Sequence, residues 1–162
     1  MSAITDFHGN YFYLSNFFTS AIIFDGETYS TIEHTFQAAK TFDPEQRQAI
    51  QNANTPAAAK RLGRQVALRP DWEEVKFDIM RDLLKQKFSQ SDLRQKLIAT
   101  GEVELIEGNT WGDRVWGCVL VKGQWVGKNH LGRLLMEIRS EIQREHRENP
   151  TGTKAEQSEN ES

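Results

Sequence analysis

The chain has 162 residues, of which 38% are hydrophobic and 27% charged, a composition typical of a globular protein long enough to build one domain around its own core. Its single cysteine, Cys118, excludes an internal disulfide, and its four histidines show no zinc-like spacing, so we expect no metal and no cofactor. The first residues lack a signal-peptide pattern and no apolar run approaches the roughly 18 residues of a membrane span, so we expect a cytoplasmic protein.

The formal net charge of −3 comes from the end of the chain. Residues 148–162 carry four glutamates and one lysine, a net of −3, so residues 1–147 are formally neutral. Because the last segment lacks large apolar side chains, we predict a disordered acidic tail there and a single domain over residues 1–147. A neutral domain argues against a protein that holds long duplex DNA by counterion release, but it permits a local basic pocket for phosphate.

The first part of the chain predicts a hairpin followed by helices. Residues 21–24 and 27–29 flank Asp25-Gly26, a dipeptide typical of a tight hairpin turn. Cap and stop residues then predict helices over residues 30–40, 44–52, 56–63, 71–88 and 91–100, with Asp43, Thr55 and Asp71 as N-caps and Gly63 and Gly101 after the ends.

The rest of the chain predicts three strands and one long helix. The strands cover residues 103–106, 115–121 and 124–126, with a turn at Lys122-Gly123 and a glycine-rich loop between the first two. Apolar residues at core spacing predict a final helix over residues 131–147. We therefore predict an α+β fold, a helix-rich single domain with a small antiparallel sheet.

The predicted helix at 30–40 carries a polar row beside an apolar one. Glu33, Gln37 and Lys40 are spaced i, i+4 and i+7, so their side chains share one face, as in a helix that lines a pocket. The alternative interpretation is a capping box, Ser30-x-x-Glu33, in which Glu33 only stabilises the first turn.

Three further segments combine aromatic, basic and glycine residues, and each has a structural alternative. Trp72 and Lys76 share a face of the helix at 71–88, where they could bind a base and a phosphate or simply be a half-buried tryptophan and a solvated lysine. The loop at 108–117 is a candidate ligand loop or a turn whose aromatics fill the core. Gly127-Lys128-Asn129 precedes the last helix and could bind an anion there, or Asn129 could cap the helix.

The motifs occur in a defined order along nearly the whole domain, from about residue 6 to residue 143. They are Ser15-Asn16-Phe17, Glu33-His34-x-Phe36-Gln37-Ala38-x-Lys40, Gly63-Arg64, Trp72-x-x-x-Lys76-x-x-x-Met80, Lys87-Phe88, Asp113-x-x-Trp116-Gly117 and Gly127-Lys128-Asn129-x-Leu131-Gly132. In this order they resemble the NADAR family, which includes N-glycosidases of riboflavin-biosynthesis intermediates.

The resemblance implies hydrolysis of a bond between ribose C1 and an exocyclic amine. It implies one of two substrate classes, ADP-ribosylated guanine in DNA or RNA, or the phosphorylated ribosylamino-pyrimidines of riboflavin biosynthesis. Carried onto this sequence, it implies Glu33 and Asp113 as the catalytic carboxylates, with Lys40 as a possible Schiff-base nucleophile. The implied substrate-binding residues are Asn16 and Gln37 for sugar hydroxyls, Trp72 and Trp116 for the base, Arg64, Lys76 and Lys128 for phosphate, and Gly117 and Asn129 beside them.

Two other functions remain open from the sequence. A module that binds ADP-ribose or a nucleotide without cleaving it would need the tryptophans and cations but no carboxylate pair. A structural protein would leave the polar residues on solvated faces. Two features add nothing to the resemblance, namely Trp111 and the insert at 119–126, and the insert bears on substrate preference, because a longer strand pair beside the pocket could narrow it or brace a polynucleotide. The sequence determines neither the substrate nor the oligomeric state.

Overall fold

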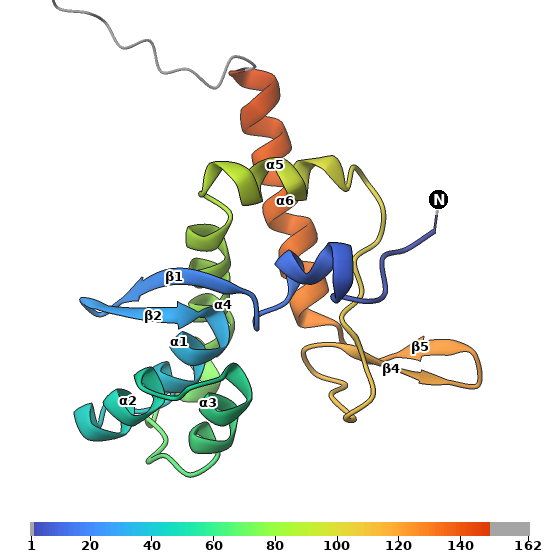
Figure 1. The fold of residues 1–162 in the computed structure, drawn as a ribbon. Coiled ribbons are helices and arrows are strands. Elements are labelled where there is room, and N and C mark those ends of the chain that lie inside the picture. The colour runs from blue at the N-terminus through green and yellow to red at the C-terminus, as the bar shows by residue number, and fades with distance from the viewer. Residues whose placement is uncertain (1, 150–162) are drawn as a thin grey trace, which may run out of the picture.

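The computed structural model describes residues 2–149, so residues 150–162 of the predicted tail lie outside the described part. Helices are the main secondary structure and the strands form two small sheets, which confirms the α+β prediction (Figure 1). The elements are η1 (Gly9–Leu14, a 3-10 helix), β1 (Thr19–Phe24), β2 (Glu27–Thr31), α1 (Ile32–Ala39), α2 (Pro44–Gln51), α3 (Pro56–Gly63), α4 (Trp72–Lys87), α5 (Ser91–Ala99), β3 (Gly108–Asn109), β4 (Cys118–Val121), β5 (Gln124–Val126) and α6 (His130–Glu148).

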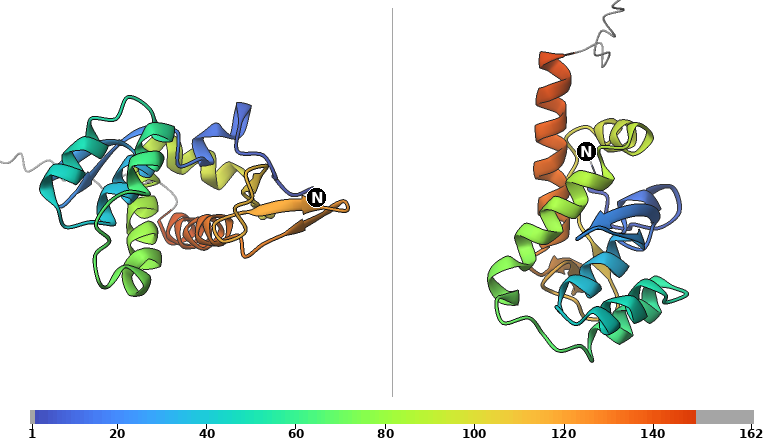
Figure 2. Two further views of the ribbon diagram at one scale, coloured as in Figure 1. Left: turned by 90° about the horizontal axis from the view of Figure 1, so that it is seen from below. Right: turned by 90° about the vertical axis from the view of Figure 1, so that its left-hand side faces the viewer.

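Helix α1 lies at the centre of the helical part. All eight of its residues are buried, and it packs against β1, β2, α2, α3 and α4. The long helix α6 packs against α4 and α5, and the β4–β5 hairpin projects from the side of the molecule opposite β1–β2 (Figures 1 and 2). Within residues 2–149 no helix is long and apolar enough to cross a membrane.

The β1–β2 hairpin forms as the sequence predicts. Asp25 and Gly26 have φ angles of 47° and 79°, the left-handed conformation that a type I′ turn requires at both central positions. The second sheet has the order β3-β4-β5, in which β3 runs parallel to β4 and β5 runs antiparallel to it.

Two predicted strands differ in the structure, since one does not form and the other is shorter. Residues 103–106 form no strand, and only Leu105 makes a bridge, to Ile4 near the N-terminus. The strand predicted at 115–121 begins at Cys118 instead. Its first residues are used elsewhere, because the carbonyls of Val115 and Trp116 accept hydrogen bonds from the first N–H groups of α6.

The helix N-caps are confirmed where a side chain accepts a backbone N–H. Asp43 accepts from Glu45 and Gln46, and Thr55 accepts from Ala58. Asp71 occupies the cap position of α4 but makes no capping hydrogen bond, because its carboxylate instead accepts from the Arg69 guanidinium.

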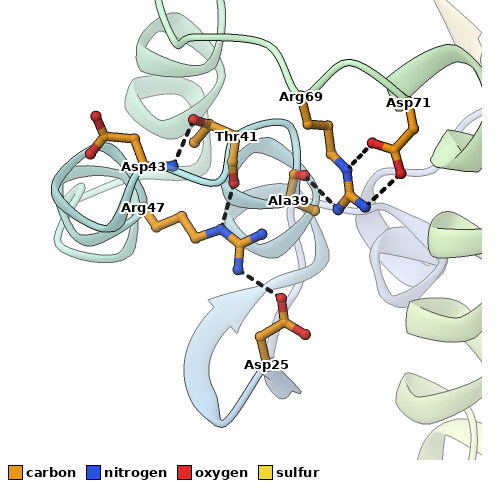
Figure 3. Close-up of polar contacts among 7 residues, drawn as sticks. All are labelled: Asp25, Ala39, Thr41, Asp43, Arg47, Arg69 and Asp71. Atoms are coloured by element: carbon orange, nitrogen blue, oxygen red, sulfur yellow. Dashed lines mark hydrogen bonds and ion pairs between the residues drawn. The ribbon is translucent and has the colours of Figure 1, made fainter.

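Two arginines hold the C-terminal end of α1, where Lys40 emerges (Figure 3). Arg69 donates to the carbonyl of Ala39 from its side chain and to the carbonyl of Lys40 from its backbone. Arg47 donates from Nε to the carbonyl of Thr41, at 2.6 Å, and from Nη1 to Asp25 in the hairpin turn, at 2.7 Å. Positive charge at a helix C-terminus is stabilising, so these contacts fix the position of Lys40.

Candidate active site

One pocket of about 350 Å³ gathers most of the predicted site residues. Its walls come from α1, α4, the segment after η1, the loop before β4 and one residue of α3, Lys60. Because these segments are far apart in the sequence, the pocket forms only when the chain is folded. The lining residues are Phe7, His8, Phe12, Ser15, Asn16, Phe17, Glu33, Phe36, Gln37, Lys40, Lys60, Trp72, Lys76, Met80, Glu107, Gly108, Trp111, Asp113, Trp116 and Leu131.

Glu33 is a buried carboxylate on the first turn of α1, with 8% of its surface exposed. Its backbone N–H donates to the carbonyl of Asn16, which ties the helix start to the segment after η1. The N-cap of α1 is Thr31, whose hydroxyl accepts from the N–H of His34, so the Ser30 capping box is wrong and Glu33 is free to line the pocket. Burial raises the pKa of the Glu33 carboxyl, although the hydrogen bond from Gln37 and the nearby Lys60 oppose that rise.

Gln37 is the direct partner of Glu33. Its amide donates to Glu33 Oε1 at 2.8 Å, one turn away along α1. Its own carbonyl, Oε1, is buried against Gly63 and finds no donor among residues 2–149. A Cβ at Gly63 would lie 1.9 Å from this oxygen, so Gly63 makes room for Gln37 rather than only ending α3. Gln37 therefore orients the Glu33 carboxylate, in addition to lining the pocket.

Lys40 lies at the end of the same stripe. Burial lowers the pKa of its ammonium group, and the neighbouring Arg64 and Lys60 lower it further, whereas Glu33 opposes them. A lysine whose pKa is lowered is a better nucleophile at neutral pH, so the arrangement suits the Schiff-base role that the resemblance implies.

Asp113 enters the pocket from the loop before β4. Its Oδ1 accepts the backbone N–H groups of Val115 and Trp116, at 3.0 and 2.9 Å. Its own N–H donates to the side chain of Asn109, which in turn donates back to the Asp113 carbonyl. The loop thus holds the carboxylate by hydrogen bonds, and its charge adds to the effect of burial in raising the pKa of Glu33, which lines the same pocket.

A third carboxyl, Glu107, lines the pocket and was not predicted. Burial raises its pKa to about 7, and the charge of Asp113 adds to that rise, while the Asn109 amide, donating at 3.0 Å, and Lys60 oppose it. A Cβ at Gly117 would lie 1.8 Å from Glu107 Oε2, so the predicted residue Gly117 contributes by leaving room for this carboxyl. In the sequence Glu107 is an isolated acid after a predicted strand, and no pattern distinguishes it from a surface residue.

The predicted base-stacking residues are part of an aromatic wall. Trp72 is buried and lies 5.0 Å from the Phe36 ring, and Trp116 lies 5.2 Å from Phe36 and 5.3 Å from Phe77. Both tryptophans border the pocket, but Phe36 and Phe77 already pack against their rings and leave less of each ring for a base. The apolar wall excludes water around Glu33 and Glu107, and this burial is the main reason that the pKa values of these two carboxyls are raised.

Asn16 and Lys76 also line the pocket. The Asn16 amide lies 3.7 Å from the Met80 sulfur, and its buried Oδ1 has no donor among residues 2–149, so it can accept a hydroxyl. Lys87 fixes Ser15, the residue before Asn16. Lys87 is fully buried, and its ammonium donates to the carbonyl of Ser15 at 2.9 Å. Lys76 forms an ion pair with Glu73 on the outer side of α4.

Four predicted binding residues do not line the pocket, and one of them is Gly117, described above. Arg64 is exposed at the end of α3, and Lys128 is exposed before α6. Asn129 is buried, but its side chain bonds the backbone of Leu105 and Glu107 rather than capping α6. The N–H groups of residues 128–131 donate to the carbonyls of residues 114–117, so these four groups are not available to a phosphate.

Comparisons with known proteins show the family of the chain. The NADAR domain family model matches residues 5–143. N-glycosidase YbiA of Escherichia coli is 43% identical over 131 residues, covering 79% of each chain, and N-glycosidase Npun_R5314 of Nostoc punctiforme is 40% identical over 134 residues, covering 79% of this chain and 83% of that one. The riboflavin biosynthesis protein VVA0006 of Vibrio vulnificus is 36% identical over 137 residues, which are 83% of this chain but 36% of that protein.

The fold is likewise shared with a solved structure. The NMR structure of E. coli YbiA superposes with a TM-score of 0.76 at 40% identity, covering 91% of this chain and 90% of that one. These matches confirm the family and the N-glycosidase class predicted from the sequence. The chain belongs to the NADAR family.

Proposed function

We propose that this N-glycosidase hydrolyses the bond between ribose C1 and an exocyclic amine, with Glu33 and Asp113 as its catalytic carboxyls. The single observation that carries the proposal is that both acids line one pocket, Glu33 from α1 and Asp113 from the loop before β4, each oriented by its own hydrogen bonds. Cleavage of an N-glycosidic bond develops positive charge on the sugar, and a carboxylate beside C1 stabilises that charge.

The two carboxyls suit different roles. Glu33 is buried and its pKa is raised, so it can hold a proton and donate it to the departing amine. Asp113, anchored by two backbone N–H groups, can stabilise the sugar cation and take a proton from the attacking water. The water oxygen then bonds to C1, the C1–N electron pair leaves with the amine, and the two acids exchange protonation states before the next turnover.

A covalent route uses Lys40. If the sugar ring opens, the Lys40 amine can attack C1, release the amine as a Schiff base forms, and be freed when water hydrolyses that Schiff base. Borohydride would reduce the intermediate to a stable adduct on Lys40. An adduct found by peptide mass during turnover supports this route, and turnover without any adduct supports direct hydrolysis by the carboxyls.

The proposal covers two candidate substrate classes, and both carry a phosphorylated sugar on an exocyclic amine. One is ADP-ribosylated guanine in DNA or RNA. The other is a phosphorylated ribosylamino-pyrimidine of riboflavin biosynthesis, which the name of the Vibrio vulnificus relative supports. The lone Cys118, buried and unsuited to a disulfide framework, supports a cytoplasmic setting for either substrate.

The test is to incubate the protein with each substrate separately and to follow release of the free base by mass spectrometry. Release from an oligonucleotide bearing ADP-ribosyl-guanine identifies the first class, and release from the ribosylamino-pyrimidine phosphate identifies the second. A folded protein that releases neither base, yet binds ADP-ribose, would contradict the proposal and identify a non-catalytic binding module.

A further inference from the structure

Trp111 lies in the short loop between β3 and β4 and is one of the residues that line the pocket. The loop is clamped at its base by Asn109, whose side chain accepts from the N–H of Asp113 at 3.0 Å and donates to the carbonyl of the same residue at 2.9 Å. Gly112 has a φ angle of 86°, a conformation that glycine adopts without strain, and this allows the chain to turn back directly after Trp111. The tryptophan is therefore presented at a fixed position although its side chain is largely in solvent.

The three tryptophans at the pocket differ in how much of their rings is free. Trp72 is 5% exposed and Trp116 packs on Phe36 and Phe77, whereas Trp111 is 55% exposed and still borders the pocket. A single exposed aromatic residue is ordinary on a protein surface. Trp111 differs because it is held at the mouth of the pocket and leaves a large part of its indole free for a ligand.

A cation from another part of the chain meets this indole. Lys60, on α3, places its Nζ 5.4 Å from the centre of the Trp111 ring, within the range of a cation–π contact. Lys60 also borders the pocket, and among residues 2–149 no carboxylate lies within 4.0 Å of its Nζ. A positive charge over one face of the indole and a largely exposed remainder of the ring thus lie together at the pocket, on segments about fifty residues apart in the chain.

We propose that Trp111 and Lys60 form a binding subsite for the leaving heterocycle, with the base stacked on the Trp111 indole and a substrate phosphate paired with the Lys60 ammonium. The proposal rests on the proposed function and deepens it, because it identifies what holds the group on the far side of the C1–N bond. Both substrate classes share this chemistry, a planar base that carries an exocyclic amine together with a phosphate. Stacking on an aromatic side chain tolerates either base, since every base has a π-face.

Steady-state kinetics on whichever substrate is turned over tests the subsite in the active enzyme. The base is held equally in the ground state and in the transition state, so Trp111→Ala should raise KM by about tenfold or more and change kcat by less than about threefold. Trp111→Phe keeps a stacking surface and should restore most of the lost affinity. The matched control is Leu120→Ala, since Leu120 is 59% exposed on the β4–β5 hairpin and does not line the pocket.

Lys60 is tested in parallel by Lys60→Met, which keeps the aliphatic stem and removes the charge. We expect KM to rise several-fold and to become less sensitive to salt, because an ion pair with phosphate is lost. Lys122→Met, at the exposed turn of the same hairpin, controls for the loss of one positive charge. A Trp111→Ala enzyme whose KM stays within twofold of wild type, with Leu120→Ala equally unchanged, would overturn the proposal.

A binding measurement separates this proposal from the proposed function. Guanosine 5′-monophosphate carries a base with an exocyclic amine and a phosphate but has no bond for the enzyme to cleave there. We expect it to quench tryptophan fluorescence in the wild type and to bind about tenfold more weakly to Trp111→Ala. That result in a protein without glycosidase activity would keep the subsite and reject the catalytic proposal, whereas equal binding by wild type and Trp111→Ala would reject the subsite even if the enzyme is active.

Discussion

The side chains of Gln37 and Glu33 are joined by a hydrogen bond of 2.8 Å, one turn apart on α1, and Gly63 of α3 lies against the far end of the Gln37 amide. The orientation of the predicted catalytic acid therefore depends on a glycine in another helix. A side chain at that position would push Gln37 out of place, because the nearest possible Cβ lies 1.9 Å from Gln37 Oε1.

Gly63→Ala tests this dependence. Helix propensity alone favours alanine by about 1 kcal/mol, but overpacking against Gln37 costs about 1–3 kcal/mol, so we expect a net loss of stability and of activity. The double variant Gly63→Ala, Gln37→Ala relieves the clash, and its loss of stability should be smaller than the sum of the two single losses. Urea denaturation measures all four proteins, and a Gly63→Ala protein at least as stable as wild type would contradict the packing described here.

The raised pKa of Glu107 predicts a stability that falls with pH. Its carboxyl has a pKa of about 7 in the folded protein, against 4.5 ordinarily, because it is buried and faces Asp113, with only partial compensation by Asn109, Lys60 and His8. Between pH 4.5 and about 7 the folded state binds more protons than the unfolded state, so the free energy of unfolding falls as pH rises through this window.

Glu107→Gln removes that ionisation. The free energy of unfolding of the variant minus that of wild type should be larger at pH 8 than at pH 5, as measured by urea denaturation at both pH values. Glu104→Gln, at an exposed position three residues earlier, is the matched control and should show no such pH-dependent gain. Equal relative stability of Glu107→Gln at the two pH values would show that Glu107 ionises as freely in the folded protein as in the unfolded chain.

Lys87 predicts the opposite dependence at higher pH. Burial lowers the pKa of its ammonium to about 7 from 10.5, so above pH 7 the unfolded chain binds the extra proton and stability rises with pH up to about 10.5. In Lys87→Met this contribution disappears. The unfolding free energy of wild type minus that of the variant should therefore increase by up to about 1.4 kcal/mol per pH unit between pH 7 and 9.

The control for Lys87 lies on the same helix. Lys85→Met removes an exposed lysine of α4 and should not reproduce the effect. The carbonyl of Ser15 keeps a partner in Lys87→Met, since the N–H of Phe18 also donates to it, so the variant should fold. If wild type and Lys87→Met show the same dependence of stability on pH, Lys87 carries its charge inside the protein without cost.

The parts of the fold that were predictable from sequence are those determined by neighbouring residues. The Asp25-Gly26 turn and the caps at Asp43 and Thr55 form as predicted, because each is a contact within about three residues of the chain. The stripe of Glu33, Gln37 and Lys40 was also predictable, since the helical period alone places them on one face, and all three line the pocket.

The parts that were missed depend on contacts between distant segments. Glu107 is buried because Gly117 and Asn109 fold around it, and nothing near it in the sequence indicates this. Residues 103–106 have the composition of a strand, but they pair only at Leu105 with the N-terminal segment. The start of α6 was predicted to bind an anion, yet the N–H groups of residues 128–131 donate to the carbonyls of residues 114–117, a contact that only the folded chain makes.

The most direct test of the proposed chemistry measures the single-turnover rate at which the base is released. It compares wild type with Glu33→Gln and Asp113→Asn on whichever of the two substrates wild type hydrolyses. Both variants keep the size and most hydrogen bonds of the side chain, and circular dichroism would verify that they fold. We expect each to lower the rate at least about a hundredfold, because each removes a group that transfers a proton or stabilises charge in the transition state. Rates within about threefold of wild type for both folded variants would contradict the assignment of this carboxylate pair as the catalytic centre.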